Sequence, residues 1–385
     1  MNSFTFNTAN SIVFGEGSSE RIGELAALRI GQRVLLVTDP GLQKTGLIDQ
    51  ALASLSGAGI DVTIFSDVTA DPPEHVVLAA TEMAKAQRVE GIIGFGGGSS
   101  LDVAKLVALL APGRETLADL YGVGKAKGPR LPLLLVPTTS GTGSEVTPIA
   151  IVTTGASEKM GVVTPVILPD IALLDPKLTY GLPPNITAAT GIDAMVHAIE
   201  AYASTSANNN PVSRALAREA LRLMGGALER AVNDGKDPSA RADMLLGSML
   251  AGQAFANSPV AAVHALAYPI GGHFHIPHGL SNALVLPHVL RFNAVTAGHI
   301  YAEIAPHVFP DLADIGIQAR ADVFAERMAE LSQRCGLHQR LRDVGIPQDA
   351  LSLLSDDAIK QTRLLVNNPR PMTRDDIFEI YRQAW

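Results

Sequence analysis

Asp193 and His197 lie four residues apart in a mostly apolar segment with helical spacing, GIDAMVHAIEAY (191–202). Side chains four residues apart share one face of a helix, so this carboxylate and this imidazole can reach a common partner. The partner could be a metal ion, a hydrogen-bond network or only water. The pair by itself leaves these three interpretations open.

A second group of candidate ligands lies in AVHALAYPIGGHFHIPHG, which carries His264, His273, His275 and His278. A single histidine in such a segment is more often a packed, hydrogen-bonded core residue than a ligand. Together with the earlier pair, one carboxylate and three imidazoles would suit Fe²⁺, Zn²⁺ or a similar divalent ion if the helices converge. Spacing alone does not choose among the four histidines.

A glycine-rich loop, GFGGGSSLD, joins an apolar run to a helical segment. Ser99 and Asp102 have the spacing of a capping box at the helix start. Free amide groups and the absence of side chains at Gly97 and Gly98 would let a phosphate approach closely. A plain tight turn needs only one glycine, so three in a row favour a ligand site. Neither GxGxxG nor GxxxxGK[ST] occurs in the sequence, so a nucleotide site here must have another design.

A second polar loop, VPTTSGTGSEVTP (136–148), follows another apolar run and carries hydroxyl groups at Thr138, Thr139, Thr142 and Ser144. It could be a polar surface loop. However, a loop directly after a buried strand lies at the carboxyl edge of the sheet, where open α/β sheets bind ligands.

Asp39 ends the first strongly apolar run and precedes Pro40. Its carboxylate could accept hydrogen bonds from a ribose diol and would repel an additional phosphate, which favours NAD over NADP. A turn-forming aspartate before proline explains the residue equally well.

Two halves with different periodicities must position these residues. The first half alternates β-rich runs with helical segments, which predicts an α/β domain with a parallel sheet buried on both faces. We expect strands at 33–39, 60–67, 91–99, 130–140, 150–154 and 171–176. The second half has helical spacing and no convincing strand, which predicts an all-α domain. The prolines of GLPPN place the boundary between domains 1–184 and 185–385.

Composition excludes several classes of protein. The 385 residues are 47% hydrophobic and 18% charged, as in a well-buried globular protein. The net charge is −8 with no basic run, which argues against nucleic-acid binding. Cys335 is the only cysteine, so no internal disulfide forms and a reducing cytoplasm fits. We identify neither a signal peptide nor an apolar run of membrane-spanning length.

Four blocks in this order, GGGSSLD, PTTSGTGSE, GIDAMVHAIEAY and HALAYPIGGHFHIPHG, resemble the iron-dependent (group III) alcohol dehydrogenase family over essentially the whole chain. The resemblance implies the dehydroquinate synthase-like architecture, with a dinucleotide-binding α/β domain before a helical metal domain. It implies that the metal ligands, which are also the catalytic residues, are Asp193, His197, His264 and His278. It implies a cofactor site formed by Asp39, Gly97, Gly98, Ser99, Asp102, Thr138, Thr139, Thr142 and Lys159.

The same resemblance implies an NAD-dependent alcohol dehydrogenase that transfers hydride reversibly between a small primary alcohol or diol and NAD⁺. Fe²⁺, with Zn²⁺ as an alternative, would polarise the alcohol or aldehyde oxygen. It also implies a homo-oligomer, a dimer or larger, without a nucleic-acid or membrane partner. A maleylacetate reductase-like enzyme or a polyol dehydrogenase of the same superfamily is the nearest alternative. A non-catalytic nucleotide-binding sensor is the alternative from another class.

The sequence departs from the family pattern at a few positions. Tyr268 stands where many relatives carry a second histidine, so a proton-relay role cannot be transferred to it. Asp71 precedes Pro72 where relatives often have asparagine. His273 and His275 stand where relatives often have aromatic residues or asparagine, and either could polarise the pocket or face solvent.

Overall fold

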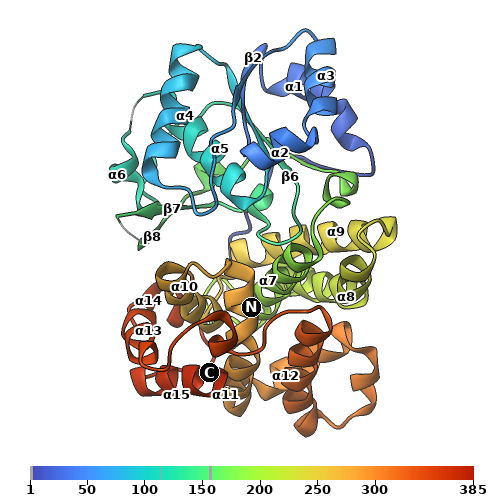
Figure 1. The fold of residues 1–385 in the computed structure, drawn as a ribbon, viewed down its shortest axis with the longest axis vertical. Helices are drawn as coiled ribbons and strands as arrows, with labels where there is room; N and C mark the ends of the chain where they lie inside the picture. The colour runs from blue at the N-terminus through green and yellow to red at the C-terminus, as the bar shows by residue number, and fades with distance from the viewer. Residues whose placement is uncertain (1–2, 114, 156–157) are drawn as a thin grey trace. The chain divides into compact units, whose positions relative to one another are not determined.

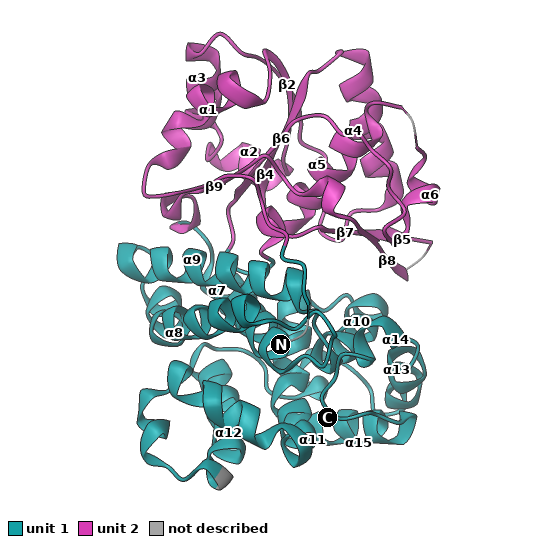
Figure 2. Ribbon diagram, turned by 180° about the vertical axis from the view of Figure 1, so that it is seen from behind, with its two compact units in different colours: residues 1–6, 140–142, 181–385 teal, residues 7–139, 143–180 magenta. Residues whose placement is uncertain are grey.

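The computed structural model describes residues 3–113, 115–155 and 158–385. The chain forms two compact units (Figure 2). The α/β unit comprises residues 7–139 and 143–180, and the helical unit comprises residues 1–6, 140–142 and 181–385. The expected division into a dinucleotide-binding domain, 1–184, and a metal-binding domain, 185–385, stays a prediction.

A six-stranded parallel sheet forms the centre of the α/β unit, with the strand order β1-β9-β6-β4-β2-β3. Its strands are β1 (Ile12–Phe14), β2 (Arg33–Val37), β3 (Asp61–Phe65), β4 (Gly91–Gly96), β6 (Leu133–Pro137) and β9 (Ile171–Leu174). Sequence analysis missed β1, which has only three residues and pairs with β9. The predicted parallel sheet is confirmed.

The central strands of this sheet are buried on both faces, because they are apolar at successive positions. Leu35 and Val37 of β2 belong to one hydrophobic cluster, whereas Val34 and Leu36 belong to a second cluster. Helices α4 (Glu74–Ala86) and α5 (Gly98–Leu110) contribute to the first cluster, and α1 (Ile22–Arg29) and α3 (Asp49–Gly57) contribute to the second. Figure 1 shows these pairs of helices on opposite sides of the sheet. The short helices α2 (Pro40–Thr45) and α6 (Leu117–Leu120) complete the unit.

The strand expected at 150–154 does not belong to the parallel sheet, and this part of the prediction is wrong. It is β7 (Ile149–Thr154), which lies in a separate sheet with the order β5-β8-β7. Here β5 is Gly122–Val123, and β8 is Glu158–Val163, antiparallel to β7. Three residues separate β7 from β8, too few for the crossover that a parallel pair needs.

The helical unit confirms the predicted all-α half, with no strand among its described residues. Its helices are α7 (Pro184–Ala203), α8 (Pro211–Asn233), α9 (Pro238–Asn257), α10 (Ala262–Phe274), α11 (His278–Val308), α12 (Ile317–Arg334), α13 (Ala350–Ala358), α14 (Thr362–Leu365) and α15 (Arg374–Ala384). Local sequence determines where two of these helices begin. Asn210 caps the N-terminus of α8 and Asp237 caps that of α9, and a proline directly follows each cap residue. Among the described residues, no helix is both long enough and apolar enough to span a bilayer.

Candidate metal centre

Three helices of the helical unit bring a carboxylate and two imidazoles together. Asp193 lies in the middle of α7, His264 in the first turn of α10, and His278 is the first residue of α11. Asp193 Oδ1 lies 3.8 Å from His264 Nε2 and 3.6 Å from His278 Nε2. One candidate ligand atom from each of the three residues lies within 4.8 Å of the other two. The sequence could not show this convergence.

Gly279 explains how α11 comes close enough to α7 for His278 to reach this cluster. A Cβ atom at Gly279 would lie 2.2 Å from the backbone oxygen of Ala189 and 3.3 Å from Asp193 Cβ. Only glycine permits this approach of the two helices. Gly279, directly after His278, therefore lets the start of α11 pack close enough to α7 for His278 to lie beside Asp193.

The charges of the cluster suit a divalent cation. Burial by itself raises the pKa of Asp193, but His197, His278, His264 and the Asn282 amide outweigh it and hold the pKa below its ordinary value. Asp193 is only 2% exposed, so it is a buried carboxylate beside imidazole nitrogens. One anionic oxygen with imidazole nitrogens is a donor set that iron and zinc accept.

Asn282, one helical turn after His278, was missed by sequence analysis. Its Nδ2 donates to Asp193 Oδ1 at 2.6 Å and lies 3.4 Å from Nε2 of both His264 and His278. Its Oδ1 is buried without a hydrogen-bond partner in the described structure. The Asn282 amide N–H group thus lies among Asp193 Oδ1 and the two Nε2 atoms. The same three atoms would attract a cation electrostatically. This arrangement fits a metal-binding function for the three residues.

His197 lies beside this group rather than within it. Its Nδ1 is 3.3 Å from the backbone oxygen of Gly141. Its ring stacks on Phe255 with centroids 4.2 Å apart and on His264 with centroids 4.7 Å apart. Burial lowers the pKa of His197 to about 3, so the imidazole is neutral near pH 7. Its expected role as a fourth metal ligand stays a prediction.

The other histidines of the same segment, His273 and His275, lie outside the metal-binding cluster. His273 Nε2 lies 2.6 Å from Asp357 Oδ2. His275 ends α10 in a left-handed conformation with φ of 54°. Tyr268 lies beside the cluster, with its ring centroid 5.8 Å from that of His278. The structure thus distinguishes His264 and His278 from their neighbours, which spacing did not.

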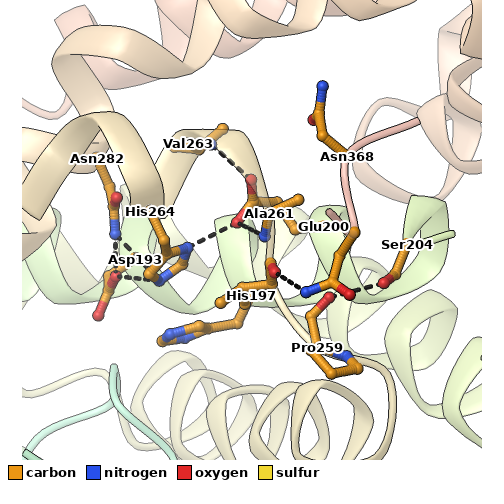
Figure 3. A network of polar contacts seen from close by, with 12 residues as sticks. Asp193, His197, Glu200, Ser204, Pro259, Ala261, Val263, His264, Asn282 and Asn368 are labelled. Carbon is orange, nitrogen blue, oxygen red and sulfur yellow. Dashed lines mark hydrogen bonds and ion pairs between the residues drawn. The ribbon is translucent and has the colours of Figure 1, made fainter. Parts of the chain in front are cut away.

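Glu200 is the second residue that sequence analysis missed. It follows Asp193 by seven residues and is 6% exposed, and its carboxylate lies 2.7 Å from His264 Nδ1 (Figure 3). His197 follows Asp193 by four residues, and Glu200 follows His197 by three. This spacing places all three residues on one face of the helix. That periodicity was the signal that could have identified Glu200.

The expected phosphate site lies at the start of α5 in the α/β unit. Gly97 is the N-cap residue, Gly98 and Ser99 begin the helix, and no side chain caps the first turn. A Cβ atom at Gly97 would lie 3.7 Å from Thr139 Cγ2, so Thr139 lies beside this helix start. Thr138 is buried, and its backbone N–H donates to the Gly96 oxygen. Free backbone amides at a helix start can bind an anion.

Asp102 does not form the expected capping box with Ser99, and this prediction is wrong. Its carboxylate instead accepts hydrogen bonds from Ser144 Oγ at 2.6 Å and from the Ile151 backbone N–H at 2.9 Å. The helix turn rotates Asp102 away from the helix start and toward the loop after β6. Within the α/β unit, Asp102 fixes that loop.

The remaining residues expected in the cofactor site, Asp39, Lys159 and Thr142, lie in three different parts of the chain. Asp39 caps α2 by accepting the Leu42 backbone N–H, as the turn interpretation predicts. Lys159 lies on β8, where its Nζ is 2.6 Å from Asp71 Oδ1. Thr142 is half-buried and belongs to the helical unit. None of these contacts by itself tests a role in cofactor binding.

Glu145, in the loop after β6, gives a prediction about pH. Burial raises the pKa of Glu145 from 4.5 to about 7. Between these pH values the folded protein keeps a proton that the unfolded chain releases, so the free energy of unfolding falls as pH rises. We expect a loss of about 3 kcal/mol from this group between pH 4.5 and pH 8.

Urea unfolding at pH 5 and pH 8 measures this loss. Glu145→Gln should flatten the dependence, whereas Glu82→Gln, a change at an exposed ion pair, should not. Parallel pH profiles for wild type and Glu145→Gln would contradict the prediction.

Comparison with known proteins agrees with this geometry. Residues 9–176 match the family model for iron-containing alcohol dehydrogenases, and residues 187–385 match the model for the C-terminal part of the Fe-containing alcohol dehydrogenase family. This chain belongs to the iron-containing alcohol dehydrogenase family. The predicted family, fold and enzyme class, an oxidoreductase acting on CH–OH donors, are thereby confirmed.

Individual relatives of this alcohol dehydrogenase cover nearly its whole length. It is 41% identical to long-chain-alcohol dehydrogenase 1 of Geobacillus thermodenitrificans over 361 residues, 93% of this chain and 91% of that protein. It is 32% identical to the NAD-dependent methanol dehydrogenase of Bacillus methanolicus over 373 residues, 97% of each chain. A crystal structure of 1,3-propanediol oxidoreductase superposes with a TM-score of 0.96 at 35% identity and covers all of both chains. At the level of the family, the expected cofactors, iron and NAD, are confirmed as well.

Proposed function

We propose that this alcohol dehydrogenase transfers hydride reversibly between a small primary alcohol or diol and NAD⁺. The observation that carries the proposal is the convergence of Asp193, His264 and His278 on one point in a chain of this family. Relatives named for long-chain alcohols, 1,3-propanediol and methanol support a primary alcohol or diol as substrate.

Asp193, His264 and His278 would hold the metal, with His197 as the expected fourth ligand. When bound, a divalent cation acts as a Lewis acid that stabilises negative charge on the substrate oxygen. The Asp193 carboxylate offsets part of the charge of that cation. The two imidazoles would each offer one ring nitrogen to the cation, and the packed helices hold all three side chains in place before the substrate arrives. This preorganisation lowers the cost of reaching the reactive geometry.

The residues proposed for cofactor binding are Asp39, Gly97, Gly98, Ser99, Asp102, Thr138, Thr139, Thr142 and Lys159. The backbone amides of Gly98 and Ser99 would bind the pyrophosphate. Asp102 would act indirectly, because one of its oxygens holds Ser144 in the loop after β6 and the other holds Ile151 of β7. On this proposal residues 1–184 form the cofactor domain and residues 185–385 form the metal domain.

We further propose a cytoplasmic location and a homo-oligomer, a dimer or larger. The single cysteine, Cys335, is buried, and burial raises the pKa of its thiol to about 11, which suits a protein that makes no disulfide. Size-exclusion chromatography with light scattering tests the oligomer. A monomer at micromolar concentration would contradict that part.

Reconstitution tests the catalytic proposal. Metal-stripped protein is reloaded with Fe²⁺ or Zn²⁺, and a panel of primary alcohols and diols is assayed with NAD⁺ and with NADP⁺. We expect activity to return only with metal and to be higher with NAD⁺. Tight NAD⁺ binding without oxidation of any alcohol would favour a nucleotide sensor. Full turnover by metal-free protein would favour a maleylacetate reductase-like enzyme.

A further inference from the structure

Glu200 is buried in the helical unit, and its carboxylate contacts two backbone N–H donors and a ring nitrogen of His264 (Figure 3). Oε1 accepts the backbone N–H of Val263 at 2.6 Å. Oε2 accepts the backbone N–H of Ala261 at 3.0 Å and lies 2.7 Å from His264 Nδ1. We propose that Glu200 is a positioning residue that fixes the tautomer and orientation of His264 for metal binding. This inference rests on the proposed function and assigns a role to a residue outside the ligand set.

The backbone donors come from the start of α10. Ala261 is the N-cap residue of this helix, and its methyl side chain cannot accept a hydrogen bond from the backbone N–H groups of the first turn. Glu200, from the neighbouring helix α7, supplies the missing acceptors and places its negative charge at the positive end of the helix dipole. The carboxylate accepts hydrogen bonds from the backbone of Ala261 and Val263. It therefore cannot move away from His264 without breaking these two hydrogen bonds.

The hydrogen bonds determine which nitrogen of His264 carries the proton. Both carboxylate oxygens already accept from backbone groups that can only donate, so the carboxylate is an acceptor toward Nδ1 as well. His264 therefore donates from Nδ1 and carries its lone pair on Nε2. That lone pair faces the cluster, since Nε2 lies 3.8 Å from Asp193 Oδ1 and 3.4 Å from the donor Nδ2 of Asn282. A carboxylate behind a ligating histidine also raises the basicity of the ligating nitrogen.

Little room for water remains behind the Glu200 carboxylate. The space behind the carboxylate is a small cavity of about 10 Å³, lined by Glu200, Tyr301, Asn293 and Asn368 among others. This volume is at the lower limit for one water molecule. The carboxylate is thus held mainly by fixed donors of the protein.

Glu200→Gln tests the proposal, because the change keeps the size and makes one terminal atom a donor. Affinity for Zn²⁺ is measured by titration against a chromophoric chelator. The tautomer of His264 is measured by ¹⁵N NMR of metal-free, ¹⁵N-histidine-labelled protein. We expect a loss of zinc affinity of about 10- to 100-fold. We also expect an Nδ1–H signal for His264 in the wild type and loss of that pure tautomer in the variant.

Tyr381→Phe is the matched control. It removes a buried hydrogen bond of 2.6 Å to the Leu266 oxygen of the same helix and leaves the hydrogen bonds of Glu200 in place. Both variants should melt at lower temperature than the wild type, and only Glu200→Gln should lose zinc affinity. Equal zinc affinity in wild type and Glu200→Gln would overturn the proposal. If Glu200→Gln fails to fold, an Nε2–H tautomer of His264 in wild-type protein would overturn it.

The two readouts separate this inference from the proposed function. Wild-type protein that binds zinc and shows the Nδ1–H tautomer but oxidises no alcohol would refute the proposed function only. An alcohol dehydrogenase whose zinc affinity does not depend on Glu200 would refute the positioning role only.

Discussion

Replacement of His278 by alanine is expected to lower kcat/KM for alcohol oxidation by about a thousandfold or more. The change removes one of the three converging donors, and metal-assisted stabilisation of a developing negative charge contributes several kcal/mol to a barrier. The fold should survive, because the His278 side chain is 40% exposed at the first position of α11. Bound iron or zinc, measured by elemental analysis, should fall together with activity, while the melting temperature changes by only a few degrees.

His275→Asn is the matched control for this experiment. His275 is exposed, lies three residues from His278 and ends α10 with a positive φ, which asparagine tolerates. This variant should keep its metal and most of its activity. Full activity of His278→Ala at a metal content near zero would refute the metal mechanism.

The largest expected loss of stability follows from Lys105→Met in the α/β unit. Lys105 is completely buried in α5, and its Nζ donates to Ser144 Oγ at 2.7 Å and to the Ile149 oxygen at 2.8 Å. Burial lowers the pKa of Lys105 and raises that of Asp102, whose Oδ1 lies 3.5 Å from Nζ. Removing one partner of a buried ion pair leaves the other charge uncompensated and costs about 3–5 kcal/mol.

Urea unfolding monitored by circular dichroism measures the effect. Lys85→Met is the control, because Lys85 forms an exposed ion pair with Glu82 in the neighbouring helix α4, and such pairs contribute about 1 kcal/mol at most. The affinity for NAD⁺ should also fall in Lys105→Met, since Lys105 holds the loop after β6 against α5. Unfolding midpoints that are equal for the two variants would contradict this account of the buried cluster.

The sequence was sufficient for features that depend on local pattern. Successive apolar residues such as those of β2 cannot be solvated on either face, so they predicted a sheet covered on both sides. The four-residue spacing of Asp193 and His197 required a shared helical face, and the glycines at 97 and 98 predicted a helix start that a phosphate can approach closely. The order of the four sequence blocks indicated the family, because their spacing is far more specific than any one loop.

Spacing in the sequence did not distinguish His264 and His278 from His273 and His275; the family resemblance implied the choice, and the tertiary structure shows its physical basis. All four lie within fifteen residues, and what separates them is which helix packs against α7, a contact between residues about 70 to 90 positions apart in the chain. The assignment of Asp102 to a buried network depended likewise on Ser144 and Ile151, which meet it only after the sheet has formed. Glu200 and Asn282 gained their roles from donors and acceptors on other helices. Sequence periodicity fixes the direction of a side chain on its own element, whereas its partners are set by the packing of elements that are distant in sequence.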